Sequence, residues 1–152
     1  MLVWRVVRKA RAAQALSGEG ARLNGGRWNH VGIPVVYTSE SLSLAVLEYV
    51  VHVSIPDLPK ELVSVRIDIP DKLPRTAITA DELPDGWRTS RVKAKLRDIG
   101  THWARGGASP IVVVPSVVIP NELNYILNPN HPLASSVKVV SVEPLALDRR
   151  LY

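Results

Sequence analysis

Apolar and polar residues alternate along several short stretches of this chain, and alternation with a period of two predicts β-strands. The clearest stretch is ELVSVRIDIP at 61–70, where apolar residues recur at every second position: Val63, Val65, Ile67 and Ile69. In an extended chain these side chains share one face, so we expect them in the core. The other predicted strands are VWRVV at 3–7, PVVYTS at 34–39, SPIVVVPSVVIP at 109–120 and SSVKVVSVEPLAL at 135–147. Because prolines interrupt the strand at 109–120, we expect it at an edge or a bulge.

Helical spacing of apolar residues marks other stretches. A helix is predicted from about residue 41 to 52, and the hydroxyl of Ser39 or Ser41 can cap its first turn. Nearly all its sides are apolar, as in a buried helix. A second helix is predicted at 89–106, where glycine ends it. NELNYILNP at 121–129 predicts a short helix that its final Asn-Pro ends.

Irregular connections separate these elements. Glycine and asparagine are frequent from Gly18 to Gly32, which predicts a long, structured loop, and residues 71–86 form a connection rich in proline and aspartate. Strands and helices are mixed rather than strictly alternating, and no linker or repeat divides the chain. We therefore expect a single domain over residues 1–152, of the α+β class, with a mixed β-sheet core and flanking helices.

Composition narrows the possible functions. The 152 residues include no cysteine, which excludes disulfides, thiolate metal sites and cysteine nucleophiles and favours a reducing, cytoplasmic setting. The charged N-terminal segment lacks the apolar centre of a signal peptide, and no apolar run approaches the ~18 residues of a membrane span. The four histidines show no HxH or HxxxH spacing, so we expect no metal site.

The chain is basic, with a net charge of +5 and an isoelectric point of about 9.8. A basic excess is compatible with nucleic acid, an acidic partner or a phosphate-bearing ligand. Residues 1–27 carry much of it, with Glu19 as their one acid. For most of these basic residues we favour a solvated face, and Arg5 is open to two interpretations, a phosphate contact or a cap of the first strand.

Glu48 places a carboxylate in the aliphatic run LAVLEYVVH. An acid removed from water costs several kcal/mol unless something pairs with it, about 2–7 for a neutral polar group and more for a charge. A structural explanation is a local pair with His52 at i,i+4. A functional explanation is a cleft in which the carboxylate acts. The sequence of this helix alone favours neither the structural nor the functional explanation.

The loop segment LNGGRWN places Arg27 after two glycines and before Trp28. Glycine lets a ligand approach the backbone closely, and the guanidinium fork matches phosphate oxygens in pairs, so the segment suits a pyrophosphate-containing ligand. It is not a dinucleotide fingerprint, because Gly18–Leu23 lacks the third glycine, and it has no GK[ST] of a P-loop. The structural alternatives are an arginine stacked on Trp28 or paired with an acid.

Two hydroxyl residues complete the candidate set. Tyr37 lies in a predicted strand between Arg27 and Glu48, and its structural alternative is a core aromatic with a satisfied hydroxyl. Ser116 follows Pro115, and its structural alternative is a turn hydroxyl that bonds local backbone.

Two blocks of sequence resemble the RES domain family, the toxins of bacterial RES–Xre toxin–antitoxin pairs. They are SGEGARLNGGRWNHVGIPVVYTSESLSLAVLEYVVH and PSVVIPNELNYILNPNHP, and the resemblance spans about residues 3–140. The family is named for Arg, Glu and Ser, which match Arg27, Glu48 and Ser116, and Tyr37 matches an active-site tyrosine. The chain departs from the family at Asn24, where an aromatic residue is common.

The resemblance implies an ADP-ribosyltransferase-like fold with NAD+ as substrate rather than cofactor. Family members cleave the bond between nicotinamide and ribose, some as glycohydrolases, some by phosphorolysis, and some modify a protein. Loss of NAD+ then arrests growth. The implied partners are an Xre-like helix-turn-helix antitoxin that blocks the site and a second toxin in a homodimer, with DNA contacted only through the antitoxin.

The resemblance also implies roles for the matching residues. Departure of nicotinamide leaves positive charge on the ribose, and the Glu48 carboxylate would stabilise it as it develops. Arg27 would hold the pyrophosphate. Tyr37 would lie against the nicotinamide ring or bond the ribose. Ser116 would bind ligand or orient Glu48.

Other functions remain open from sequence. One is an ADP-ribosyltransferase acting on a protein target. Another is a non-enzymatic, basic nucleic-acid-binding module, which rests only on the charge. A third is a ribonuclease-type toxin in which His52 and Glu48 would serve as acid and base.

Overall fold

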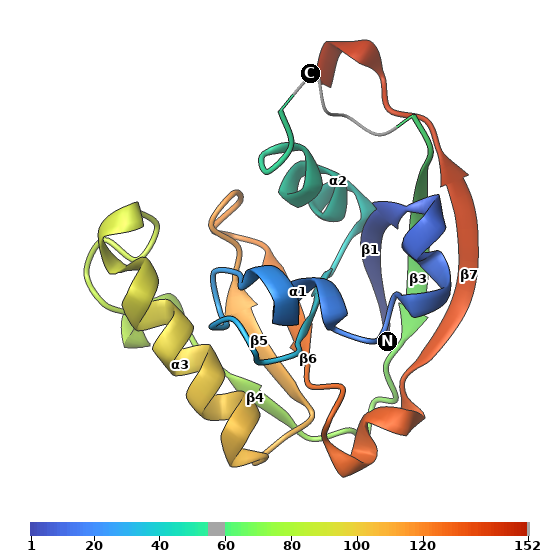
Figure 1. Ribbon diagram of the computed structural model, residues 1–152. Helices are drawn as coiled ribbons and strands as arrows, with labels where there is room; N and C mark the ends of the chain where they lie inside the picture. The colour runs from blue at the N-terminus through green and yellow to red at the C-terminus, as the bar shows by residue number, and fades with distance from the viewer. Residues whose placement is uncertain (55–59, 152) are drawn as a thin grey trace.

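A seven-stranded sheet organises the computed structural model in the part of the chain that it describes, residues 1–54 and 60–151 (Figure 1). The strands lie in the order β4-β5-β6-β2-β1-β3-β7, and all neighbours are antiparallel except β4 and β5. Their bounds are β1 (Leu2–Arg8), β2 (Val36–Ser39), β3 (Leu62–Asp68), β4 (Arg75–Ala77), β5 (Ile111–Pro115), β6 (Leu123–Leu127) and β7 (Lys138–Leu145).

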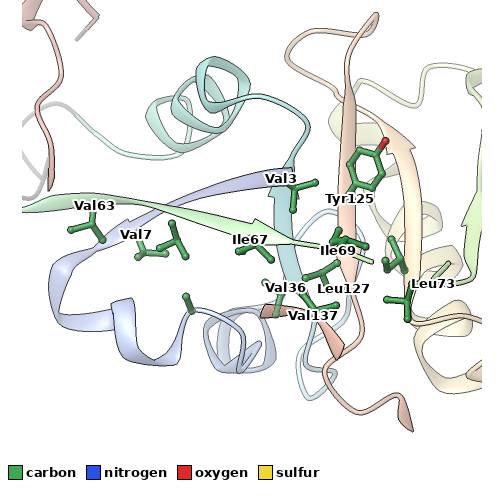
Figure 2. Packing of buried hydrophobic residues seen from close by; sticks show 13 residues of the cluster. Val3, Val7, Val36, Val63, Ile67, Ile69, Leu73, Tyr125, Leu127 and Val137 are labelled. Atoms are coloured by element: carbon green, nitrogen blue, oxygen red, sulfur yellow. The ribbon is translucent and has the colours of Figure 1, made fainter. Parts of the chain in front are cut away.

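One face of this sheet carries the largest apolar cluster, to which β1, β2, β3, β5 and β6 all contribute (Figure 2). The alternation at 61–70 predicted its centre correctly, since the four apolar residues of that face are at most 4% exposed. β1 and β2 share a single residue pair, Trp4 with Ser39, whereas β1 and β3 pair along their whole lengths. With so little pairing at this point, β1, β3 and β7 lie at an angle to β5 and β6 (Figure 1).

Two helices cover the other face. α2 (Leu42–Val50) begins at Ser41, whose hydroxyl accepts a hydrogen bond from the Leu44 N–H, and packs its Ala45 against β1 and β3. α3 (Lys93–Gly106) packs against β5 and β6 and ends at Gly107, which has a φ of 64°. Both helix predictions are confirmed. α2 is less buried than expected, because Leu44 and Ala45 are its buried residues.

Short helical segments occupy several connections. They are α1 (Glu19–Asn24) and the 3-10 segments η1 (Lys9–Gln14), η3 (Ala80–Glu82), η4 (Ser90–Val92), η5 (Pro132–Ser136) and η6 (Arg149–Leu151). The connections predicted at 18–32 and 71–86 were therefore too simple, since the first contains α1 and the second contains β4. A bilayer crossing would need a longer and more apolar helix than any found in the described ranges.

The helix predicted at 121–129 is wrong, because Leu123–Leu127 forms β6. This strand pairs with β2 on one side and β5 on the other, and Tyr125, Ile126 and Leu127 are buried. Sheet pairing on both sides outweighs the local helical preference of so short a segment. The edge position expected for 109–120 is also wrong: β5 lies between β4 and β6 in continuous register, and Pro115 is its last residue.

Candidate active site

Glu48 projects from α2 toward residues that follow it by about 70 positions in the chain. Its Oε1 accepts two hydrogen bonds, from Ser116 Oγ at 2.8 Å and from Asn124 Nδ2 at 2.6 Å. Among the described residues, no side chain donates to Oε2. Protein donors therefore hold one carboxylate oxygen of Glu48, and the other has none among the described side chains.

The local pair of Glu48 with His52 is not formed. α2 ends at Val50, so His52 lies in the following turn, where it is exposed. The i,i+4 geometry requires a continuous helix, and it is lost here. The structural explanation based on a local pair with His52 is wrong.

Ser116 bonds both the local backbone of its turn and the Glu48 carboxylate. It is fully buried directly after β5. Its Oγ accepts from the backbone N–H groups of Val118 at 3.1 Å and Ile119 at 3.0 Å, as a turn hydroxyl does. The same hydroxyl donates to Glu48, so the turn after β5 fixes the carboxylate of α2.

Tyr37 lies in β2, and its hydroxyl both accepts and donates a hydrogen bond. The oxygen accepts from the Trp28 N–H at 2.9 Å, and the hydroxyl donates to Asn29 Oδ1 at 2.7 Å. Burial raises the pKa of Tyr37, because the anion would lose its hydration there. Asn29 in turn donates to the carbonyls of Ala21 and Ile33. These bonds order the part of the glycine-rich segment that follows α1.

Arg27 begins within this loop and is half-buried. Its Nη1 makes one long contact, to the Trp87 carbonyl at 3.5 Å. Burial lowers the pKa of Arg27, and the charges of Glu48 and Tyr37 act in the opposite direction. In the described ranges no carboxylate forms an ion pair with Arg27, so the alternative of a structural acid partner is not found.

Arg97 of α3 is a neighbour that the sequence did not reveal. Its Nε donates to the Gly26 carbonyl at 2.8 Å, one residue before Arg27. Its positive charge also acts on the Tyr37 hydroxyl, where it favours the anion. In sequence, Arg97 is one of several basic residues on an amphipathic helix, and only its contact with the loop distinguishes it.

Comparison with known proteins gives this arrangement a context. The family model described as "RES domain" matches residues 2–148. This chain belongs to the RES domain family. The match extends over nearly the whole chain, so the resemblance seen in the two sequence blocks is confirmed.

Proteins similar in sequence to this RES domain are described as toxins. A "Prs ADP-ribosylating toxin" of Sphingobium sp. (strain YBL2) is 38% identical over 97% of this chain and 94% of its own. A "Toxin Res" of Photorhabdus laumondii subsp. laumondii is 40% identical over 85% of this chain and 82% of its own. A chain in the crystal structure of the M. tuberculosis MbcT-MbcA toxin-antitoxin complex superposes with a TM-score of 0.77 at 19% identity, over 95% of this chain and 84% of that one. The α+β fold with a mixed β-sheet core and flanking helices, expected from sequence, is confirmed, and it is the fold of that chain.

Two features of this RES domain lie apart from the candidate site. Arg5 pairs with Val65 across β1 and β3, and cross-strand partners share a face, so Arg5 lies on the core face. Its Nη1 is buried and has no hydrogen-bond partner within residues 1–54 and 60–151, and burial lowers the pKa of Arg5. A small cavity lined by residues that include Leu16, Val36 and Leu127 also lies on the core side and contains none of the candidate side chains.

The RES domain also uses residues that pattern reasoning missed. Asn124, Asn29 and Arg97 each bond a candidate residue or its loop. Asn124 was assigned to a helix, so its side chain had no predicted neighbour. An asparagine among apolar residues in LNYIL is the one signal that could have found it, because a buried amide requires partners.

Proposed function

We propose that this RES domain is the toxin of a bacterial toxin–antitoxin pair and that it degrades NAD+ by cleaving the bond between nicotinamide and ribose. Support for a toxin comes from the family and from the names of its relatives. Support for NAD+ cleavage comes chiefly from Glu48, which keeps one carboxylate oxygen free while Ser116 and Asn124 hold the other.

The chemistry needs a fixed negative charge. Nicotinamide leaves as a neutral ring and takes the bonding electrons, so positive charge develops on the ribose. A carboxylate already oriented beside that ribose stabilises the transition state more than the ground state, which is the condition for faster turnover. Glu48 fits this requirement because its position is set before any ligand arrives.

The loop and α3 supply positive charge for the phosphates. Arg97 bonds the Gly26 carbonyl one residue before Arg27, and in the described ranges neither guanidinium has a carboxylate partner. Guanidinium groups without an anion are suited to the two phosphates of a dinucleotide. Tyr37 accepts a hydrogen bond from the Trp28 N–H and so keeps the loop that carries Arg27 in place.

The acceptor of the ADP-ribosyl group is the next question. Water would give a glycohydrolase, phosphate a phosphorylase, and a protein side chain a transferase. The transferase is the second candidate function, because a relative 38% identical to this chain bears the name "Prs ADP-ribosylating toxin". All three begin with the same loss of nicotinamide.

The test is nicotinamide release from NAD+ by the purified chain, with products identified by mass spectrometry in the presence and absence of phosphate and of protein acceptors. Glu48→Gln should keep the fold and lose about 10²- to 10³-fold in kcat, as expected for one lost electrostatic group. Full turnover by a folded Glu48→Gln variant would remove Glu48 from the mechanism. Tight, salt-dependent binding of DNA or RNA without nicotinamide release would instead favour the nucleic-acid-binding module.

We also propose an Xre-like helix-turn-helix antitoxin as partner, with the toxin as a homodimer within the complex and DNA reached through the antitoxin. The similar fold in a toxin–antitoxin complex supports a partner of this kind. Co-expression with the neighbouring gene product, followed by nicotinamide release with and without it, tests the inhibition.

A further inference from the structure

A chain of three side chains leads from β2 to the candidate catalytic carboxylate. Ser39 Oγ donates to Asn124 Oδ1 at 2.8 Å, and Asn124 Nδ2 donates to Glu48 Oε1 at 2.6 Å. Ser39 and Asn124 are partners across β2 and β6, so the sheet register places their side chains next to each other on the face that α2 covers. The chain therefore connects the rigid sheet to the helix that carries Glu48.

The direction of these bonds is fixed by chemistry. An ionised carboxylate only accepts hydrogen bonds, so the amide nitrogen of Asn124 has to face Glu48. The amide oxygen then faces Ser39, and the Ser39 hydroxyl has to donate to it. Ser39 is buried, so water competes little for this bond. The amide is thus locked in the one orientation that offers an N–H to Glu48.

We infer that Asn124 is a positioning residue that, together with Ser116, holds Glu48 Oε1 so that Oε2 faces the ribose of the substrate. This inference rests on the function proposed above, because it assigns the working oxygen of that same site. Asn124 donates from β6, and Ser116 donates from the turn after β5. Two donors from different elements fix the plane of the carboxylate better than either donor alone. Asn124 acts through Glu48 and needs no contact with substrate.

The test compares a substitution of Asn124 that is smaller and neutral with one that keeps its size but adds a negative charge. Asn124→Ala removes the donor, and kcat for nicotinamide release should fall about 10- to 100-fold with KM within ~3-fold. Asn124→Asp keeps the shape but sets a second carboxylate against Oε1, so its kcat should fall below that of Asn124→Ala. A residue that only fills space would give the reverse order, since aspartate replaces its volume and alanine does not.

Two further single variants and one double variant complete the design. Ser39→Ala should lower kcat less than Asn124→Ala, because the amide keeps its nitrogen toward Glu48 but loses its lock. Asn121→Ala, at an exposed position in the turn before β6, is the matched control and should leave kcat unchanged. In a Glu48→Gln background, Asn124→Ala should cause no further loss. Unchanged kcat in both Asn124 variants, or Asn124→Asp more active than Asn124→Ala, overturns the inference.

Failure of this inference can be told apart from failure of the proposed function. Absence of nicotinamide release by the wild-type chain would count against the function. The link between Asn124 and Glu48 is then read from urea unfolding of the Asn124→Ala, Glu48→Gln and double variants. Non-additive losses in midpoint support the contact, and additive losses overturn it.

Discussion

The backbone of Gly26 lies directly against the hydroxyl of Tyr37, so closely that a Cβ on Gly26 would collide with the phenolic oxygen. It would also meet Asn29 Oδ1 at 2.8 Å. The second glycine of LNGGRWN is therefore required by packing between the loop and β2. This contact sets where Arg27 leaves the loop, because Arg27 is the next residue.

Gly26→Ala should destabilise the fold by about 1–3 kcal/mol, as overpacking at a rigid site does. Gly20→Ala is a suitable control, because no atom lies within 4 Å of the place its added methyl group would take and alanine favours the α1 helix. Urea unfolding of both variants measures the difference. Adding Tyr37→Phe to Gly26→Ala should recover part of the loss by removing the colliding oxygen. Equal stability of the two alanine variants would contradict the close contact.

Stability should fall at alkaline pH in a way that depends on Tyr37. Its pKa is raised above the ordinary value of 10.0 by burial, so the folded state favours the neutral phenol. The resulting stabilisation is complete below the unfolded pKa and is lost as pH rises from there toward the folded pKa. Tyr37→Phe should flatten the decline of unfolding free energy above about pH 10, measured by urea titration, compared with wild type. An identical decline in both proteins would exclude Tyr37 as its source.

Arg97→Gln should lower activity on NAD+, because it removes a guanidinium group proposed to bind the phosphates. We expect kcat/KM for NAD+ to fall about 10- to 100-fold, the scale of a lost hydrogen bond to a charged group. Nicotinamide mononucleotide, with one phosphate, should lose less, and nicotinamide riboside, with none, should be unaffected. Arg105→Gln, exposed on the same helix, is the control. The same loss for all three substrates would show that Arg97 supports the Gly26 loop rather than the phosphates.

Ser116→Ala should affect both stability and turnover. The variant leaves the N–H groups of Val118 and Ile119 without their acceptor and costs about 1–3 kcal/mol of unfolding free energy. It also removes one of the two donors to Glu48, so kcat should fall while KM changes little. Ser136→Ala, an exposed turn hydroxyl that bonds the Leu133 carbonyl, controls for loss of a local turn bond. Wild-type kcat in a folded Ser116→Ala variant would separate the turn from the chemistry.

The local sequence pattern predicted the structure of a segment correctly where a single signal, such as apolar spacing or a helix cap, dominates that segment. The two-residue period at 61–70 predicted the centre of the core. The sequence offered Ser39 or Ser41 as the cap of the next helix, and Ser41 is the one that caps α2. The pattern failed at 121–129, because helix or strand there depends on whether β2 and β5 lie alongside. That failure concealed Asn124, since the side-chain neighbours of a residue in a sheet belong to other strands.

The sequence by itself determined the class of fold, the family, and the four candidate residues that its two family-like blocks contain: Arg27, Tyr37, Glu48 and Ser116. Residue type and short-range spacing encode these. The tertiary structure alone decided that Glu48 binds Ser116 and Asn124 rather than His52, and that Arg97 joins the Gly26 loop. Those contacts join residues about 70 positions apart, and only the sheet order and the packing of α2 and α3 bring such residues within hydrogen-bond distance.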